Sequence, residues 1–68
     1  MRFGEVVVST GRDEDGEPHG SEICFDGRVW KLSAWPYRVA TVEPLGDGAV
    51  VVSYKDGAQR LLEAEDAL

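Results

Sequence analysis

Few side chains in this sequence could take part in catalysis, and their neighbours do not favour it. His19, the single histidine, lies between a proline and a glycine in an acidic segment. A nucleophile–histidine arrangement needs a serine or cysteine held beside the imidazole. Cys24 lies in an apolar stretch with no basic neighbour in sequence that would lower the pKa of its thiol. We expect an exposed, inert His19, a structural Cys24 with redox chemistry or intermolecular pairing as the alternative, and no enzymatic activity.

The acidic segment at residues 11–21 partly follows the spacing of a calcium-binding loop. Asp13, Asp15 and Glu22 would occupy the third, fifth and twelfth places of an EF-hand. The first place is Gly11, which has no carboxylate, and no helical pattern flanks the segment. A solvated loop, either functional or disordered, is therefore the better interpretation. No metal or other cofactor is expected.

The side chains best suited to recognition are aromatic residues beside an arginine. Trp35 and Tyr37 flank a proline where a connector meets a strand, and Arg38 follows directly. Exposed aromatic rings next to arginine are typical of protein recognition surfaces. The sequence therefore predicts a binding surface made of Trp35, Tyr37, Arg38 and Tyr54. The alternative for Trp35 is that its ring plugs one end of the fold.

The first half of the sequence predicts strands that position part of this surface. Residues 2–10 read as one strand whose run of three valines suggests burial on both faces. Residues 22–32 read as a hairpin with Asp26 and Gly27 as a two-residue turn. That turn places Ile23 opposite Trp30 and assigns Ile23, Phe25, Trp30 and Leu32 to the core side of the ribbon.

The second half predicts a three-stranded antiparallel meander. One strand starts at Tyr37 or Arg38 and ends at Pro44, residues 49–54 form the next, and the third ends at Leu62. Residues 63–68 read as a final turn of α-helix or 3₁₀ helix that caps the mouth of the barrel.

The turn between the last two strands determines how their apolar residues are paired. A two-residue turn of Asp56 and Gly57 would pair Val52 with Leu61 and Val51 with Leu62, which puts apolar pairs on both faces. A ribbon of this kind indicates a strongly bent, closed sheet.

These elements predict one all-β domain over residues 1–68. The expected fold is a small antiparallel barrel of five to six strands with a short C-terminal helical turn, and a two-layer packing of β-sheets is the alternative. A chain of 68 residues buries only about 60% of the surface of its unfolded form, so the core must be thin.

Composition restricts the possible partners. The net charge is −6, and an acidic protein repels nucleic-acid backbones. Basic residues nevertheless outnumber acidic ones between residues 28 and 60, so nucleic-acid binding stays an alternative. No apolar run is long enough to span a membrane or to form a signal-peptide core. We therefore expect a cytoplasmic protein with no membrane partner.

The C-terminal half resembles the Tudor and wider SH3-like barrel pattern. In that pattern an aromatic–Tyr-Arg stretch precedes a strand, a Gly-Asp-Gly turn, an alternating valine strand and an Asp-Gly turn. The matching residues here are Trp35, Tyr37, Arg38, Val42, Gly46, Asp47, Gly48, Val50, Val52, Tyr54, Asp56 and Gly57. The resemblance implies an SH3-like barrel. It also implies a cage for a methylated lysine or arginine, for which Trp35, Tyr37 and Tyr54 are the candidates.

We therefore expect a non-enzymatic module that recognises a protein or peptide. The alternatives are a small barrel that binds nucleic acid through its basic middle, or a structural subunit, including a homo-oligomer, that hides a strand edge.

Overall fold

The computed structural model describes all 68 residues and contains seven strands and two short 3₁₀ helices. In chain order the elements are β1 (Arg2–Phe3), β2 (Val6–Arg12), β3 (Pro18–Phe25), β4 (Arg28–Leu32), η1 (Pro36–Arg38), β5 (Val39–Pro44), β6 (Val50–Tyr54), β7 (Gln59–Leu62) and η2 (Ala64–Asp66). No helical segment has the length and apolar character needed to cross a membrane.

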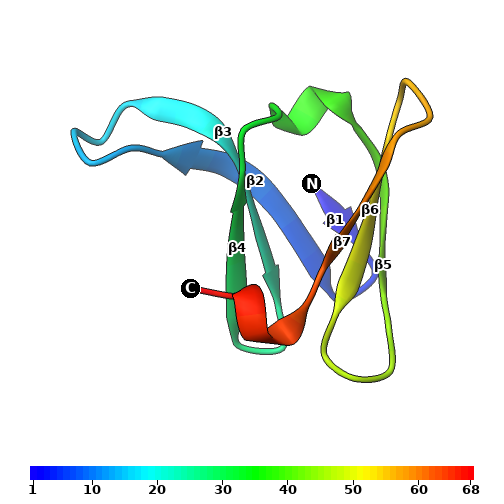
Figure 1. Cartoon of the computed structure of the whole chain (residues 1–68). Helices are drawn as coiled ribbons and strands as arrows, with labels where there is room; N and C mark the ends of the chain where they lie inside the picture. The colour runs from blue at the N-terminus through cyan, green and yellow to red at the C-terminus, as the bar shows by residue number, and fades with distance from the viewer.

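The strands form two antiparallel sheets. Strands β1 to β4 form a four-stranded sheet, and β5 to β7 form a three-stranded sheet, each in sequence order (Figure 1). The prediction of an all-β fold is confirmed. The strand pairing gives two sheets with no closed barrel, and seven strands form where five to six were expected. This arrangement corresponds to the two-layer alternative.

The core lies between the two sheets and draws on both. Its ten buried side chains are Val6, Val8, Ile23, Trp30, Leu32, Val39, Val42, Val50, Val52 and Leu62. The predicted core side of the first hairpin is therefore confirmed for Ile23, Trp30 and Leu32, while Phe25 is only partly buried and packs against the core.

The N-terminal segment folds back on itself, where a single strand was expected. Phe3 pairs with Val6 across a turn in which Gly4 has a φ of 63°. Val6 and Val8 are buried while Val7 is only partly so, because successive residues of a strand point to opposite faces. The expected burial of the valine run on both faces is therefore wrong.

The predicted acidic loop at residues 11–21 is mostly strand. Strand β2 continues to Arg12 and β3 begins at Pro18, so that only residues 13–17 connect them. Gly11 and Gly20 are both buried. A Cβ on Gly11 would lie 2.6 Å from the carbonyl oxygen of His19, and one on Gly20 would overlap the carbonyl oxygen of Leu32. These glycines permit the close approach of neighbouring backbones. In the sequence, the glycine-rich composition of this segment looked the same as that of a loop.

The hairpin between β3 and β4 has the predicted register. Ile23 pairs with Trp30, and Phe25 pairs with Arg28. Asp26 and Gly27 have φ values of 52° and 76°, as a type I′ turn requires at both central positions.

The hairpin between β6 and β7 differs from the prediction by one residue. The amide of Tyr54 donates to the carbonyl of Ala58 at 2.8 Å, and Gly57 has a φ of 91°, so three residues form the loop. Val51 therefore pairs with Leu61, and Val50 with Leu62. The first pair lies on the partly exposed outer face and the second is in the core, so the predicted burial on both faces is wrong.

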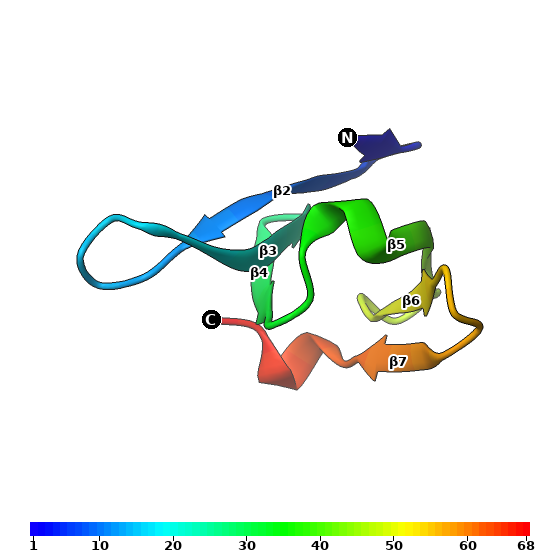
Figure 2. The same cartoon turned by 90° about the horizontal axis from the view of Figure 1, so that it is seen from above.

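The C-terminal tail joins the two sheets. The indole nitrogen of Trp30 donates to the carbonyl oxygen of Glu63 at 2.9 Å, and the amide of Leu68 donates to the carbonyl of Val29 at 2.8 Å. Figure 2 shows the tail continuing from β7 toward the side of β4. The predicted final helical turn is confirmed as η2, and its place is along the side between the sheets.

Candidate binding surface

A 3₁₀ turn presents three of the four residues predicted to form the binding surface. Pro36 occupies the first position of η1, where its fixed φ suits a helical start and its missing N–H is not needed. The amide of Arg38 donates to the carbonyl oxygen of Trp35 at 3.0 Å. Tyr37 and Arg38 therefore lie in η1 and β5 starts at Val39, so the predicted strand start is wrong by one or two residues.

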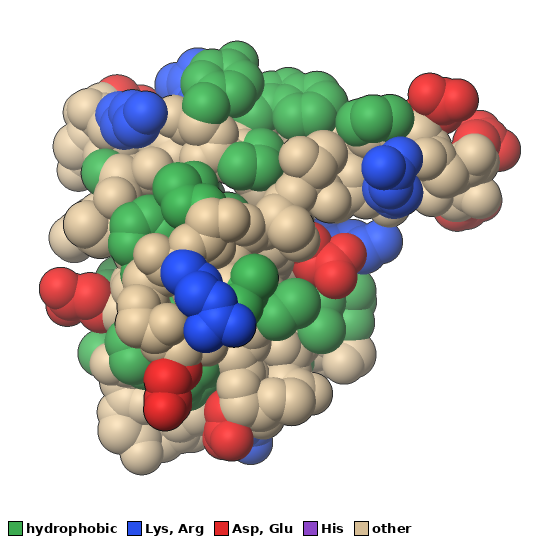
Figure 3. Space-filling view, turned by 180° about the vertical axis from the view of Figure 1, so that it is seen from behind, with side chains coloured by type: hydrophobic (Ala, Val, Ile, Leu, Met, Phe, Trp, Pro, Cys, Tyr) green, Lys and Arg blue, Asp and Glu red, His purple; other side chains and the backbone are tan.

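The two aromatic side chains of this turn reach solvent to different extents. Tyr37 is 67% exposed and Trp35 is 38% exposed. Trp35 thus packs over more than half of its surface and leaves the rest open to solvent. Figure 3 shows hydrophobic side chains gathered along the top of the molecule, where η1 lies.

The neighbouring sheet adds Tyr54 and Lys55 to the same corner. Val39 pairs with Tyr54, and the amide of Lys55 donates to the carbonyl oxygen of Arg38 at 2.9 Å. Tyr54 is half-buried and packs against the core. We call the group of Trp35, Tyr37, Arg38, Tyr54 and Lys55 the aromatic corner.

The charges of the corner are unequally paired. The guanidinium of Arg38 lies 3.9 Å from the carboxylate of Asp56 and remains about half exposed. Tyr37, Arg38, Lys55 and Asp56 line a shallow hollow. Sequence reasoning did not select Lys55 or Asp56. The pairing of β5 with β6, which brings residue 54 next to residue 39, was the signal that would have placed them there.

Two of the other basic residues of the middle segment, Arg28 and Lys31, have partners of their own. Arg28 forms an ion pair with Asp26 at 3.1 Å, and the Lys31 ammonium donates to the carbonyl oxygen of Arg12 at 3.1 Å. Only Arg38 and Lys55 meet at the corner. The basic residues that cluster in the sequence between residues 28 and 60 are therefore spread over different parts of the folded surface.

The residues considered for catalysis lie elsewhere. Cys24 is partly buried, and its Sγ lies 3.8 Å from Oε1 of Glu22. Burial, and then the charge and hydrogen bond of Glu22, raise the pKa of the Cys24 thiol. A raised pKa keeps the thiol protonated and weakly nucleophilic. His19 is exposed in β3, and no group of three histidine, cysteine or acidic side chains is arranged to hold a metal ion.

No protein-family model, curated protein or solved structure matches this chain. The chemistry of its surfaces is therefore the basis for assigning a function.

Proposed function

We propose that this chain is a non-enzymatic binding module that recognises a protein or peptide through the aromatic corner, on a framework related to the SH3-like, Tudor-like barrels. The observation that carries the proposal is the 67% exposure of Tyr37, which lines the same hollow as Arg38. A large exposed aromatic side chain is costly to leave in water and is a frequent anchor of interfaces.

The backbone of the corner supports this role. Arg38 is held by hydrogen bonds on both sides, its amide donating to Trp35 and its carbonyl accepting from Lys55. A residue fixed in this way loses little conformational freedom when a ligand binds, and that preorganisation favours affinity.

The charge of the corner favours one chemistry of ligand. Arg38 and Lys55 together outweigh Asp56, so the corner attracts a carboxylate more than a cation. We therefore propose a segment that combines an apolar or aromatic side chain with an acidic one. A methylated lysine, which the Tudor-like resemblance implies, would meet these two positive charges.

The test is affinity capture from the native host, comparing the wild-type chain with Tyr37→Ala. Proteins that bind the corner should be lost from the Tyr37→Ala bait. Because the side chain is two-thirds exposed, the free energy of unfolding should change by no more than about 0.5 kcal/mol. Leu68→Ala is the matched control, because Leu68 is also an exposed apolar residue and lies beside Val29, away from the aromatic corner.

Trp35→Ala separates the two roles considered for that ring. Lost capture with a nearly unchanged melting temperature indicates a contact residue, whereas a matching loss of stability indicates a plug. An identical set of captured proteins for the wild-type chain, Tyr37→Ala and Trp35→Ala would overturn the proposal.

A further inference from the structure

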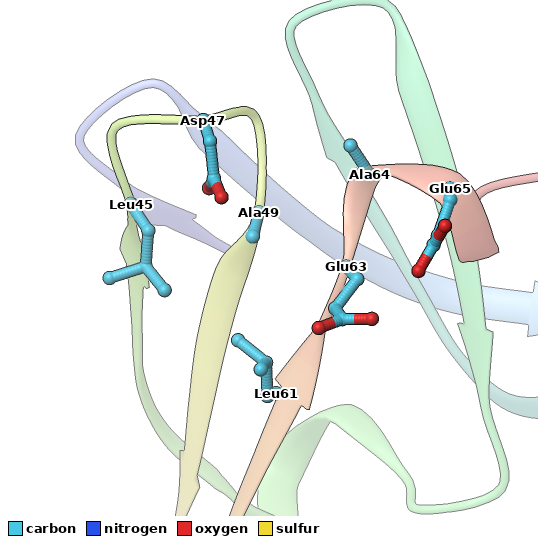
Figure 4. Close-up of a pocket in the computed structure, with 7 residues that line it drawn as sticks. All are labelled: Leu45, Asp47, Ala49, Leu61, Glu63, Ala64 and Glu65. Atoms are coloured by element: carbon cyan, nitrogen blue, oxygen red, sulfur yellow. The ribbon is translucent and has the colours of Figure 1, made fainter.

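A second hollow lies at the opposite end of the three-stranded sheet from the aromatic corner. It is a shallow groove of about 310 Å³ between the loop joining β5 to β6 and the C-terminal tail (Figure 4). Its lining residues are Leu45, Asp47, Ala49, Leu61, Glu63, Ala64 and Glu65. We call it the acidic groove.

The apolar part of the groove is open to solvent. Leu45 and Leu61 are 43% and 51% exposed, and Ala49 and Ala64 complete the apolar lining. Leu61 is on the outer face because the loop between β6 and β7 has three residues, which pairs it with Val51. Exposed leucines beside a concave surface supply an anchor for an apolar side chain.

The rim of the groove carries unneutralised negative charge. Asp47 extends from the loop, and Glu63 and Glu65 extend from the tail on the other side (Figure 4). None of the three forms an ion pair, since the only two ion pairs of the chain are Arg28–Asp26 and Arg38–Asp56. The pKa of Glu63 is raised, first by a hydrogen bond with Glu65 and by the negative charge of Glu65. Slight burial and the charges of Asp66 and Asp47 raise it further. A cation placed here would relieve this repulsion.

Arg28 lies beside the loop that carries Asp47, and it forms no ion pair with any rim carboxylate. Its guanidinium packs against Gly48, where a Cβ would lie 3.1 Å from it, and its charge is paired with Asp26. Its charge is therefore engaged outside the groove.

We propose that the acidic groove binds a short basic protein segment, in which an apolar side chain contacts Leu45 and Leu61 while an adjacent lysine or arginine lies between Asp47 and Glu63. Both parts of this ligand follow from the lining, since the apolar floor alone would accept any hydrophobic group. The three carboxylates select positive charge and reject acidic segments. The proposal goes beyond the function proposed for the aromatic corner, which has the opposite charge and lies at the other end of the sheet.

The test is a titration of the full ¹⁵N-labelled chain with the peptide acetyl-Leu-Lys-Leu-Arg-amide, followed by amide chemical shifts. We expect shifts at residues 45–49 and 61–65, with residues 35–39 unchanged. The dissociation constant should be on the order of 1 mM, because a short flexible peptide buries little area and loses much conformational entropy. Acetyl-Gly-Lys-Gly-Arg-amide tests the apolar part and acetyl-Leu-Glu-Leu-Glu-amide tests the charge, and both should bind more weakly.

Two variants assign the binding to the rim. Asp47→Asn and Glu63→Gln should each raise the dissociation constant of the peptide by about two- to fivefold, which is the effect of losing one exposed ion pair. Both substitutions remove a carboxylate that other carboxylates repel, so neither should destabilise the fold. Weaker binding by these variants therefore reports the loss of a contact with the peptide. Glu14→Gln removes one exposed charge from the hairpin between β2 and β3 and should leave binding unchanged.

Three results would overturn the proposal. These are the absence of shifts at several millimolar peptide, equal binding of the acidic peptide, or an equal effect of Glu14→Gln. A mass that doubles with protein concentration and is restored to one chain by Glu63→Gln would instead assign the groove to a second copy of this chain. Failure of the groove leaves capture by Tyr37 unaffected, so the two proposals are tested separately.

Discussion

At the scale of single residues, buried glycines determine how closely the strands approach. Gly20 has a φ of 65°, and a Cβ there would overlap the carbonyl oxygen of Leu32. Gly4 has nearly the same φ, 63°, with nothing within 4 Å of its Cβ position. The two glycines therefore share one backbone conformation and differ in their surroundings.

Replacing these two glycines separates conformational strain from close packing. Gly4→Ala should cost about 1 kcal/mol, the usual penalty for a side chain at positive φ. Gly20→Ala adds the overlap with Leu32 and should cost more than about 2 kcal/mol, a large share of the roughly 3 to 10 kcal/mol expected for a chain of this length. Urea unfolding of both variants measures the difference. Equal costs would mean that the close approach at Gly20 does not occur.

The reactivity of Cys24 provides a second test at this scale. Burial raises the pKa of its thiol, and the charge and hydrogen bond of Glu22 raise it further. Glu22→Gln removes the charge, so the pKa should fall and the fraction of thiolate at about pH 8 should rise. The rate of alkylation by iodoacetamide as a function of pH measures this. Superimposable rate profiles for the two proteins would contradict the contact between Cys24 and Glu22.

Some residues could be assigned from the sequence because a local rule constrained them. Ile23 and Trp30 were correctly placed in the core, since the type I′ turn between them fixes which residues share a face. Gly11 and Gly20 were misassigned to a loop because glycine suits both turns and close packing. Whether a glycine serves a turn or close packing depends on the strand that lies next to it, which the sequence alone does not show.

At the scale of elements, two Asp-Gly turns of similar sequence have different lengths. Asp26 and Gly27 both have positive φ and close a two-residue loop. At the second turn only Gly57 does, and the carboxylate of Asp56 accepts a hydrogen bond from the amide of Ala58 at 3.0 Å. The dipeptide alone allows both geometries, so the sequence predicted one register correctly and the other with an error of one residue.

The contact between Trp30 and the tail can be tested by removing one hydrogen bond. Trp30→Phe deletes the indole N–H that donates to Glu63 and part of the buried ring, and should destabilise the fold by about 1 to 3 kcal/mol. Amide exchange at residues 64–68 should become faster relative to the core strands. Trp35→Phe is the control, because the indole of Trp35 makes no hydrogen bond within the chain and its loss should leave tail exchange unchanged.

The tail should also respond to pH. The pKa of Glu63 is raised in the folded chain, mainly by its hydrogen bond with Glu65 and by the charge of Glu65. The folded state therefore binds this proton more tightly than the unfolded state, and stability falls as the pH rises through the raised pKa. Glu65→Gln should remove most of this dependence and stabilise the chain at neutral pH, with little effect below the ordinary glutamate pKa. Melting temperatures across that range would show it, and a parallel decrease in both proteins would contradict it.

At the scale of the whole molecule, the three-stranded sheet separates two surfaces of opposite charge. The aromatic corner lies at the end with η1 and the loop between β6 and β7, and the acidic groove lies at the other end (Figure 1). The corner was largely predictable, because Trp35, Tyr37 and Arg38 are neighbours in sequence. The groove was not, because Asp47 and Glu65 meet only after the tail crosses between the sheets.

We infer that the aromatic corner is where this chain meets its partner. The most direct measurement is the amide spectrum of the ¹⁵N-labelled chain with a partner captured by wild type and not by Tyr37→Ala. We expect the largest shifts at residues 35–39 and 54–55, on either side of the hydrogen bond between Lys55 and Arg38. Shifts confined to other segments, with those residues unchanged, would contradict it.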